Sequence, residues 1–193
     1  MSPRRSPTSV GAVLLFPGAG SAATHPSLVA IEEALAPLPV DRADFPYRRE
    51  GRRAPDRAPK LIATVVEEAR ELAERAGVAP EQVVLGGRSM GGRMCSMAVA
   101  EGLPAAGLVL ISYPLHPPGK PDRLRVEHLP ALRVPCLFVS GTRDAFATPA
   151  ELEAHTAAIP GPVEHAWIDG KGHDLKGCDE ELAGLVAAWV TRR

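Results

Sequence analysis

The sequence has 193 residues, of which 45% are hydrophobic, and its 22 Lys and Arg residues nearly balance its 23 Asp and Glu residues, giving a net charge of -1. This length suits one domain with its own core. The near-neutral charge excludes a general basic surface for nucleic acid or an anionic membrane. The cysteines Cys95, Cys136 and Cys178 lack C-x-x-C spacing, so neither a disulfide framework nor a zinc site is expected. We therefore expect a cytoplasmic protein without metal or cofactor.

The first predicted element is a strand over residues 10–16. A proline and a glycine end this apolar run, which is too short to span a membrane. Arg4 and Arg5 before it give it some likeness to a signal peptide, but its short length favours a buried strand. We expect residues 1–9 to form a disordered tail and residues 10–193 to form a single domain.

The rest of the domain alternates between short apolar runs and longer segments of helical periodicity. This pattern is typical of β-α units around a parallel sheet that helices cover on both faces. The predicted strands are 10–16, 40–45, 82–86, 107–111, 135–140 and 163–168, and the predicted helices are 26–36, 59–76, 90–100, 148–159 and 179–190. The predicted fold class is therefore α/β, with a doubly wound, mainly parallel sheet of about six strands.

Two proline-rich segments, residues 46–60 and 113–131, interrupt the alternation. The basic residues of the first are Arg48, Arg49, Arg52, Arg53, Arg57 and Lys60. Each segment follows a strand, so both should lie at the carboxyl edge of the sheet, where open α/β folds bind ligands. We expect Arg52, Arg53 and Tyr113 to contact substrate, and the arginines to favour a carboxylate or phosphate group. The other interpretation of the basic segment is a solvated loop.

The most informative motif is G-R-S-M-G at residues 87–91, which matches G-x-S-x-G between a predicted strand and a predicted helix. In a sharp strand-to-helix turn, a side chain two positions before or after the serine would collide with backbone, so Gly87 and Gly91 are required there. Such a turn exposes the serine hydroxyl. The motif predicts Ser89 as a nucleophile, although a glycine-rich turn without activity would have the same spacing.

A serine hydroxyl needs a base to take its proton and a carboxylate to orient that base. Asp144 follows the fifth predicted strand and His173 follows the sixth. The chain order serine, aspartate, histidine is that of α/β-hydrolases. Asp169 and Asp174 flank His173, and we expect these two to form turns instead. The predicted catalytic residues are therefore Ser89, Asp144 and His173.

An oxyanion hole needs two N–H donors, one from the residue after the nucleophile and one from the loop after the first strand. The P-G-A-G loop at residues 17–20 has small residues that let a substrate oxygen approach the backbone. We predict Ala19 and Met90 as the donors. The alternative, a phosphate-binding loop, lacks the spacing of the known glycine-rich phosphate motifs.

The sequence resembles small α/β-hydrolases and, in broad terms, dienelactone hydrolases. Over residues 10–192, the segments F-P-G-A-G, G-R-R-A-P-D-R-A-P-K, G-G-R-S-M-G-G-R and G-K-G-H-D-L resemble a family that includes the hydrolase-like domains of an NSL histone-acetyltransferase complex subunit and of a testis-expressed protein. The resemblance implies an α/β-hydrolase fold without its first two strands and with a minimal lid. Pro17 stands where such proteins commonly have a histidine.

These residues favour a serine hydrolase that cleaves a small ester or thioester through an acyl-enzyme. The alternative is a catalytically weak interaction module that binds an acidic partner through the basic loop at residues 48–60. The complete set of Ser89, Asp144 and His173 favours the enzyme, because a scaffold has no physical need for that set.

Overall fold

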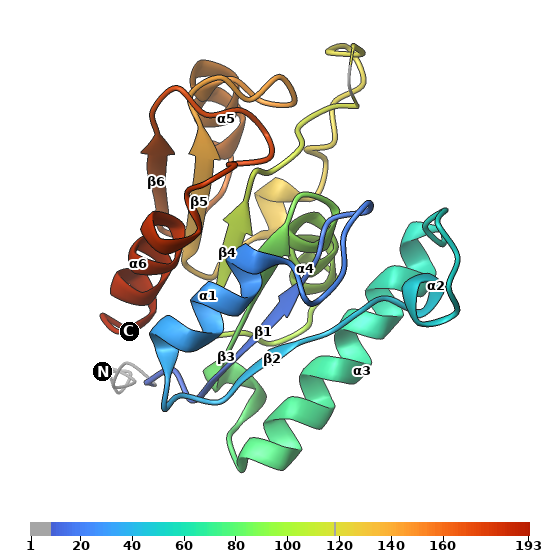
Figure 1. The fold of residues 1–193 in the computed structure, drawn as a ribbon, viewed down its shortest axis with the longest axis vertical. Coiled ribbons are helices and arrows are strands. Elements are labelled where there is room, and N and C mark those ends of the chain that lie inside the picture. Colours follow the sequence, from blue (N-terminus) through green and yellow to red (C-terminus); the bar gives the residue numbers. More distant parts are fainter. Residues whose placement is uncertain (1–8, 118) are drawn as a thin grey trace, which may run out of the picture.

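The computed structural model describes residues 9–117 and 119–193, and six parallel strands form one sheet in the order β2-β1-β3-β4-β5-β6 (Figure 1). The strands are β1 (Ala12–Phe16), β2 (Val40–Arg42), β3 (Val83–Arg88), β4 (Gly107–Ile111), β5 (Cys136–Gly141) and β6 (Val163–Ile168). The predicted α/β class and its parallel sheet are confirmed. The tail predicted for residues 1–9 lies, apart from Ser9, outside the described residues.

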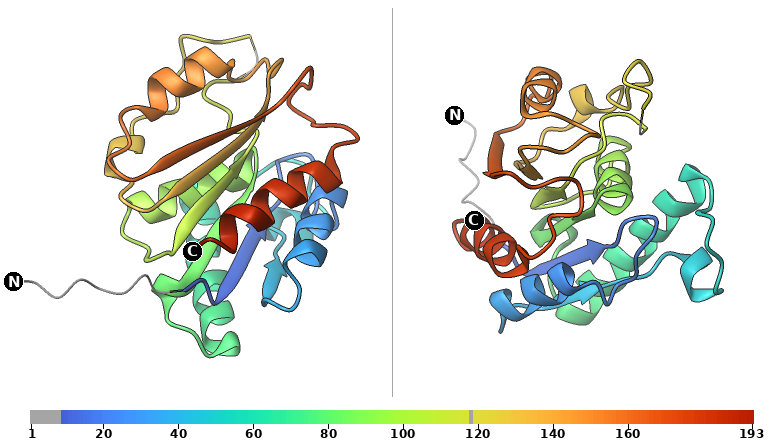
Figure 2. Two further views of the ribbon diagram at one scale, coloured as in Figure 1. Left: turned by 90° about the vertical axis from the view of Figure 1, so that its left-hand side faces the viewer. Right: turned by 45° about the horizontal axis from the view of Figure 1, so that its top comes forward.

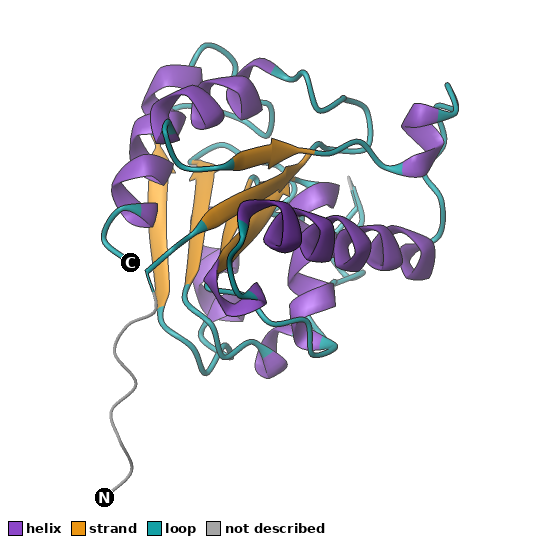
Figure 3. Cartoon of the chain, turned by 90° about the horizontal axis from the view of Figure 1, so that it is seen from below, coloured by secondary structure: helices purple, strands orange, loops and turns teal. Residues whose placement is uncertain are grey.

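Helices cover both faces of the sheet (Figures 2 and 3). Their bounds are α1 (Pro26–Leu35), α2 (Pro46–Arg49), α3 (Ala58–Ala76), α4 (Met90–Ala100), α5 (Pro149–Thr156) and α6 (Asp179–Val190), with short 3₁₀ turns at Pro80–Gln82 and Leu129–Ala131. Helices α1 and α6 pack on one face, and α3, α4 and α5 pack on the other. Within residues 9–117 and 119–193, no helix combines the length and the apolar composition that crossing a membrane requires.

The core has two halves because the central strands are buried on both faces. Every residue of β1, β3, β4 and β5 is buried. Alternate side chains of a strand point to opposite faces, so Val13 and Leu15 join the core beneath α1 and α6, whereas Leu14 and Phe16 join the core beneath α3 and α4. This double burial accounts for the uninterrupted apolar runs in the sequence.

Strand β2 is shorter than predicted. It pairs with β1 only over Val40–Arg42, whereas the prediction extended it to residue 45. Pro46 begins α2 and restricts Phe45 to extended backbone outside the sheet. The ring of Phe45 is nevertheless fully buried and stacks on Phe16 with ring centroids 4.7 Å apart. The apolar residues after β2 therefore belong to the core without belonging to the sheet.

Helix α5 also ends earlier than predicted. It ends at Thr156, whereas the prediction extended it to residue 159. The N–H groups of Ala158 and Ile159 donate to carbonyls only three residues back, which tightens the chain into turns beyond the helix.

Candidate active site

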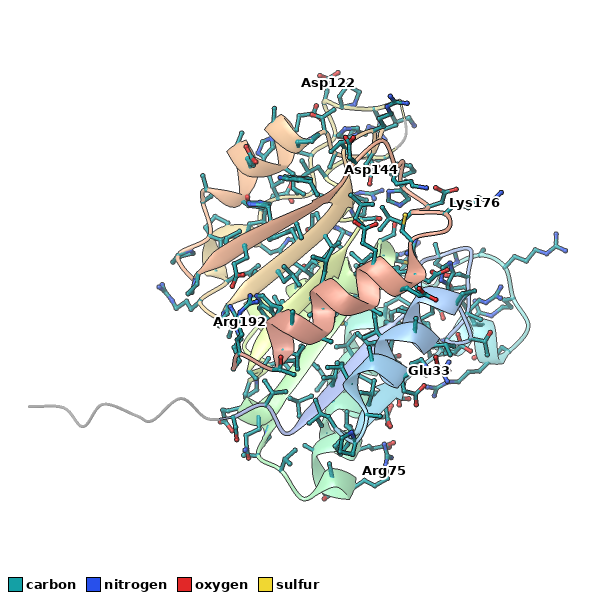
Figure 4. All side chains as sticks on the ribbon, turned by 60° about the vertical axis from the view of Figure 1, so that its left-hand side comes forward. Glu33, Arg75, Asp122, Asp144, Lys176 and Arg192 are labelled. Carbon is teal, nitrogen blue, oxygen red and sulfur yellow. The ribbon has the colours of Figure 1, made fainter. Side chains whose placement is uncertain are left out.

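The three predicted catalytic residues follow three different strands and meet at the carboxyl edge of the sheet. Ser89 follows β3, Asp144 follows β5 and His173 follows β6. Figure 4 labels Asp144 beyond the ends of β5 and β6, and Lys176 on the loop that also carries His173. Because parallel strands end at the same edge, residues far apart in the sequence come together there.

A continuous hydrogen-bond chain joins these three side chains. His173 Nε2 lies 2.9 Å from Ser89 Oγ, and His173 Nδ1 lies 2.9 Å from Asp144 Oδ2 and 3.0 Å from Asp144 Oδ1. Asp144 is fully buried, and its Oδ1 also accepts the N–H of Phe146 at 2.8 Å. The imidazole thus has a hydroxyl on one nitrogen and an oriented carboxylate on the other, which is the arrangement that general-base activation of a serine requires.

The two rival aspartates have other partners. Asp169 Oδ1 accepts the hydroxyl of Thr142 at 3.1 Å, and Asp174 Oδ1 accepts the N–H of Lys176 at 3.4 Å. Neither carboxylate forms a hydrogen bond with the His173 ring among the described contacts. Asp174 thus acts within its own turn, whereas Asp169 joins the loop after β6 to Thr142 beyond the end of β5.

The turn at Ser89 depends on close backbone contacts with the end of β1. Ser89 has φ 47° and ψ -114°, a backbone conformation that residues other than glycine rarely adopt. A Cβ at Gly87 would lie 2.1 Å from the carbonyl oxygen of Phe16, and a Cβ at Gly91 would lie 2.4 Å from the same oxygen. The two motif glycines are required because β1 ends directly against the turn.

The predicted oxyanion donors lie beside the serine. Ala19, Met90 and Ser89 line one cavity of about 340 Å³. Met90 is the first residue of α4, so its N–H has no helical acceptor. Among the described residues, the N–H of Ala19 likewise donates to no acceptor. The buried Tyr47 donates its hydroxyl to the carbonyl of Ala19 at 2.8 Å and holds this loop in place, a role the sequence did not reveal.

Arg88 connects the serine turn to the histidine loop. Its side chain is buried and donates to the carbonyl of Asp174 at 2.7 Å, to the carbonyl of His173 at 3.4 Å and to Ser27 Oγ at 3.3 Å. Burial lowers the pKa of Arg88, while the carboxylates of Asp179 and Asp174 raise it. Arg88 is a positioning residue that the sequence analysis missed, although it is the variable residue before the motif serine.

The imidazole is also held by an aromatic contact. Phe146 stacks on His173, with ring centroids 4.0 Å apart and an interplanar angle of 22°. Phe146 lines the same cavity as Ser89, so it restricts both the ring and the space beside it.

The structure brings none of the three predicted substrate contacts to this cavity. Arg52 is exposed and donates to two carboxylates of its own loop, to Glu50 at 2.7 Å and to Asp56 at 3.0 Å. Arg53 is exposed and does not line the cavity. Tyr113 is fully buried, and its hydroxyl donates to the carbonyl of Arg125 at 3.2 Å, as a buried tyrosine usually finds a polar partner.

Other residues of the two proline-rich segments do line the cavity. Pro55 and Asp56 come from the first segment, and Pro114 and Arg125 come from the second. Part of the second segment projects from the carboxyl edge of the sheet (Figure 1). The remaining lining residues come from helices α3 and α4 and are Ala58, Leu61, Arg93 and Met94. The two proline-rich segments therefore do border the cavity, through other side chains than Arg52, Arg53 and Tyr113.

The alpha/beta hydrolase domain model matches residues 9–184, and the chain belongs to that family. Similar solved structures include a dienelactone hydrolase from Anabaena variabilis, with a TM-score of 0.73, 20% sequence identity and coverage of 95% of this chain and 87% of that chain. The RedJ thioesterase from Streptomyces coelicolor has a TM-score of 0.68, 21% identity and coverage of 92% and 89%. An alpha-beta serine hydrolase homologue from Coxiella burnetii has a TM-score of 0.74, 17% identity and coverage of 95% and 86%.

At these identities the likeness shows a shared fold, and the predicted α/β-hydrolase fold is thereby confirmed. The narrower resemblance to the family of the NSL-complex subunit stays a prediction.

The first testable prediction concerns the motif glycines. Gly87→Ala and Gly91→Ala should each lower the free energy of unfolding by about 1–3 kcal/mol, because the new methyl group meets the Phe16 carbonyl. Gly20→Ala is the matched control, since a Cβ there meets nothing within 4 Å, and it should change stability by less than about 0.5 kcal/mol. Urea unfolding measures all three. Equal effects of the three substitutions would contradict the steric explanation.

The second prediction concerns His128, whose ring contacts Ser96 Oγ at 2.8 Å and the Tyr113 hydroxyl at 3.2 Å. Burial, with the positive charge of Arg93, lowers the pKa of His128 to about 4. The unfolded chain therefore binds a proton between about pH 6.5 and pH 4 that the folded protein does not bind, so stability should fall as the pH drops through this window. His128→Gln should reduce that slope in unfolding measured at several pH values. An unchanged slope would mean that His128 titrates alike in both states.

Proposed function

We propose that this protein is a serine hydrolase that cleaves a small ester or thioester through an acyl-enzyme. The observation that supports this most directly is the hydrogen-bond chain from Ser89 Oγ through His173 to the buried carboxylate of Asp144. Ser89, at one end of this hydrogen-bond chain, lines a cavity that Ala19 and Met90, the two proposed oxyanion donors, also line. The family of this protein and its structural neighbours, which include a thioesterase, agree with hydrolytic chemistry.

In the first half of the proposed reaction, Ser89 Oγ attacks the carbonyl carbon while His173 Nε2 takes the hydroxyl proton across the 2.9 Å contact. The carbonyl oxygen becomes an oxyanion and accepts hydrogen bonds from the N–H groups of Ala19 and Met90. The position of Met90 at the start of α4 adds the positive end of the helix dipole. The tetrahedral intermediate then collapses, and His173 gives the proton to the departing alkoxide or thiolate.

In the second half, His173 takes a proton from water, and the resulting hydroxide attacks the acyl carbon. The second intermediate releases the carboxylic acid and returns the proton to Ser89 Oγ through His173. Asp144 accepts the Nδ1–H of His173, which leaves Nε2 free to act as the base, and it stabilises the imidazolium that forms twice per cycle.

This mechanism uses only residues of the chain, the substrate and water, so we propose that it needs no metal or cofactor. The cytoplasmic location stays a prediction.

The basic loop supports the alternative of an interaction module less than its composition indicates, because three of its six basic residues are paired with carboxylates. Arg49 is paired with Glu68, Arg52 with Glu50 and Asp56, and Lys60 with Asp56 at 3.3 Å. A loop in which half of the basic residues already contact carboxylates offers less positive charge to an acidic partner than its composition indicates.

The third prediction tests the nucleophile. Ser89→Ala should lower kcat/KM for p-nitrophenyl acetate by about 10³-fold or more, because no covalent intermediate can form, and should abolish labelling by a fluorophosphonate probe. The melting temperature should change little. Ser112→Ala is the matched control, since Ser112 also follows a strand with a positive φ, 48°, but is fully buried and does not line the cavity. Labelling that survives Ser89→Ala would exclude Ser89 as the nucleophile.

The fourth prediction tests the acid. Asp144→Asn should lower kcat by on the order of 10³-fold or more, because an amide cannot enforce the productive imidazole tautomer. Its oxygen can still accept the N–H of Phe146, which preserves the fold. Asp169→Asn and Asp174→Asn serve as controls and should change kcat by only a few-fold. A larger loss in either control than in Asp144→Asn would reassign the acid.

A further inference from the structure

Two arginines line the cavity beside Ser89, Arg93 from α4 and Arg125 from the segment after β4. Both are partly buried. Among residues 9–117 and 119–193, neither guanidinium forms an ion pair or a side-chain hydrogen bond, and the Nε atom of Arg93 is buried with no acceptor. A buried donor on a charged group without a partner is unfavourable. The cavity therefore presents positive charge that the described residues leave unsatisfied.

The two charges act on the same space. Burial lowers the pKa of Arg125, and the nearby positive charge of Arg93 lowers it further. The same charge of Arg93 contributes to the low pKa of His128. Like charges at one partly dehydrated site repel each other, and an anion between them would remove the repulsion.

Both arginines are held in place by their backbones. The N–H of Arg93 donates to the carbonyl of Ser89 at 3.0 Å, and this hydrogen bond fixes the Arg93 backbone one helical turn after the nucleophile. The N–H of Arg125 donates to the carbonyl of Leu115 at 2.7 Å, and the carbonyl of Arg125 accepts the hydroxyl of Tyr113. These hydrogen bonds fix the main chain at both arginines, and so the points from which the two side chains reach the cavity.

The one carboxylate among the cavity-lining residues is already occupied. Asp56 accepts Arg52 at 3.0 Å, and Lys60 lies 3.3 Å from its other oxygen. The hydrogen bond from Arg52 and the charge of Lys60 hold the pKa of Asp56 below its usual value. Asp56 is therefore paired with Arg52 and Lys60, and among the described residues it forms no ion pair with Arg93 or Arg125.

We propose that Arg93 and Arg125 form an oxyanion-binding subsite, so that the substrate is a small ester or thioester whose acyl group carries a carboxylate or a phosphate. The ester or thioester group of this substrate rests on the proposed function. Its carboxylate or phosphate rests on the cavity alone. Guanidinium groups bind planar carboxylates and phosphates through paired hydrogen bonds. The cavity of about 340 Å³ is near the lower end of the size range of ligand pockets, which suits a short acyl chain.

Binding is tested first, without turnover. In Ser89→Ala, isothermal titration at fixed ionic strength compares monomethyl glutarate, methyl phosphate and the neutral ester methyl valerate. We expect at least one anion to bind more tightly than methyl valerate, and the tighter anion identifies the substituent as carboxylate or phosphate. Adding Arg93→Gln or Arg125→Gln to this variant should weaken the binding of that anion by about 10- to 100-fold, which is the range for the loss of a hydrogen bond to a charged group. Arg123→Gln, at an exposed arginine of the same segment, should leave binding unchanged.

Equal binding of the anions and the neutral ester would overturn the subsite, and so would an equal effect of Arg123→Gln and Arg125→Gln. Arg93→Lys provides a second variant that keeps the charge. It should recover part of the affinity lost in Arg93→Gln, whereas a purely structural disturbance would affect the neutral ester as much as the anion.

Turnover is tested second, with the p-nitrophenyl monoester of glutarate against p-nitrophenyl valerate. In Arg93→Gln and Arg125→Gln, KM should rise about tenfold or more for the anionic ester relative to the neutral ester, whereas Arg123→Gln should leave both KM values unchanged. Anion binding without hydrolysis of any ester would refute the hydrolase and keep the subsite. Hydrolysis of both esters with the same KM in every variant would keep the hydrolase and refute the subsite.

Discussion

The contact between the end of β1 and the turn after β3 is the constraint on which the rest of the site depends. The carbonyl of Phe16 lies so close to Gly87 and Gly91 that neither position has room for a Cβ atom. This closeness places the loop with Ala19 beside Ser89, and it requires the unusual backbone angles of the serine. The fold supports the strain because β1 and β3 are neighbours in the centre of the sheet, buried on both faces.

Residues outside the proposed chemistry hold the remaining loops against this centre. Arg88 ties the serine turn to the carbonyls of the histidine loop, and Phe146 covers the imidazole. Tyr47 fixes the carbonyl of Ala19 from α2, a short helix in the basic segment. The loops that carry Ser89, His173 and Ala19 are therefore each tied to another part of the fold by a side chain. Geometry within 0.1 Å of 2.9 Å along the whole hydrogen-bond chain depends on such support.

Charge at the site follows from which carboxylates each arginine can reach. In the basic segment, Arg52 is paired with Glu50 and Asp56, and Arg49 is paired with Glu68 of α3. Arg93 and Arg125 face the cavity, where the carboxylate of Asp56 is already taken. Composition counts all of these arginines alike, whereas pairing separates those that are neutralised locally from those that keep their field for a ligand.

The sequence by itself determined the strand and helix pattern, the order of the three candidate catalytic residues and the turn at Ser89, because periodicity, glycine sterics and chain order are local properties. Only the tertiary structure decided which arginines line the cavity, that Tyr113 supports Arg125 from a buried position, and that Arg88 holds the histidine loop. It also decided that β2 ends at Arg42, since the apolar residues that follow could be buried equally well in the sheet or beneath α3. These features depend on contacts between segments far apart in the chain, and a one-dimensional pattern contains no distance between such segments.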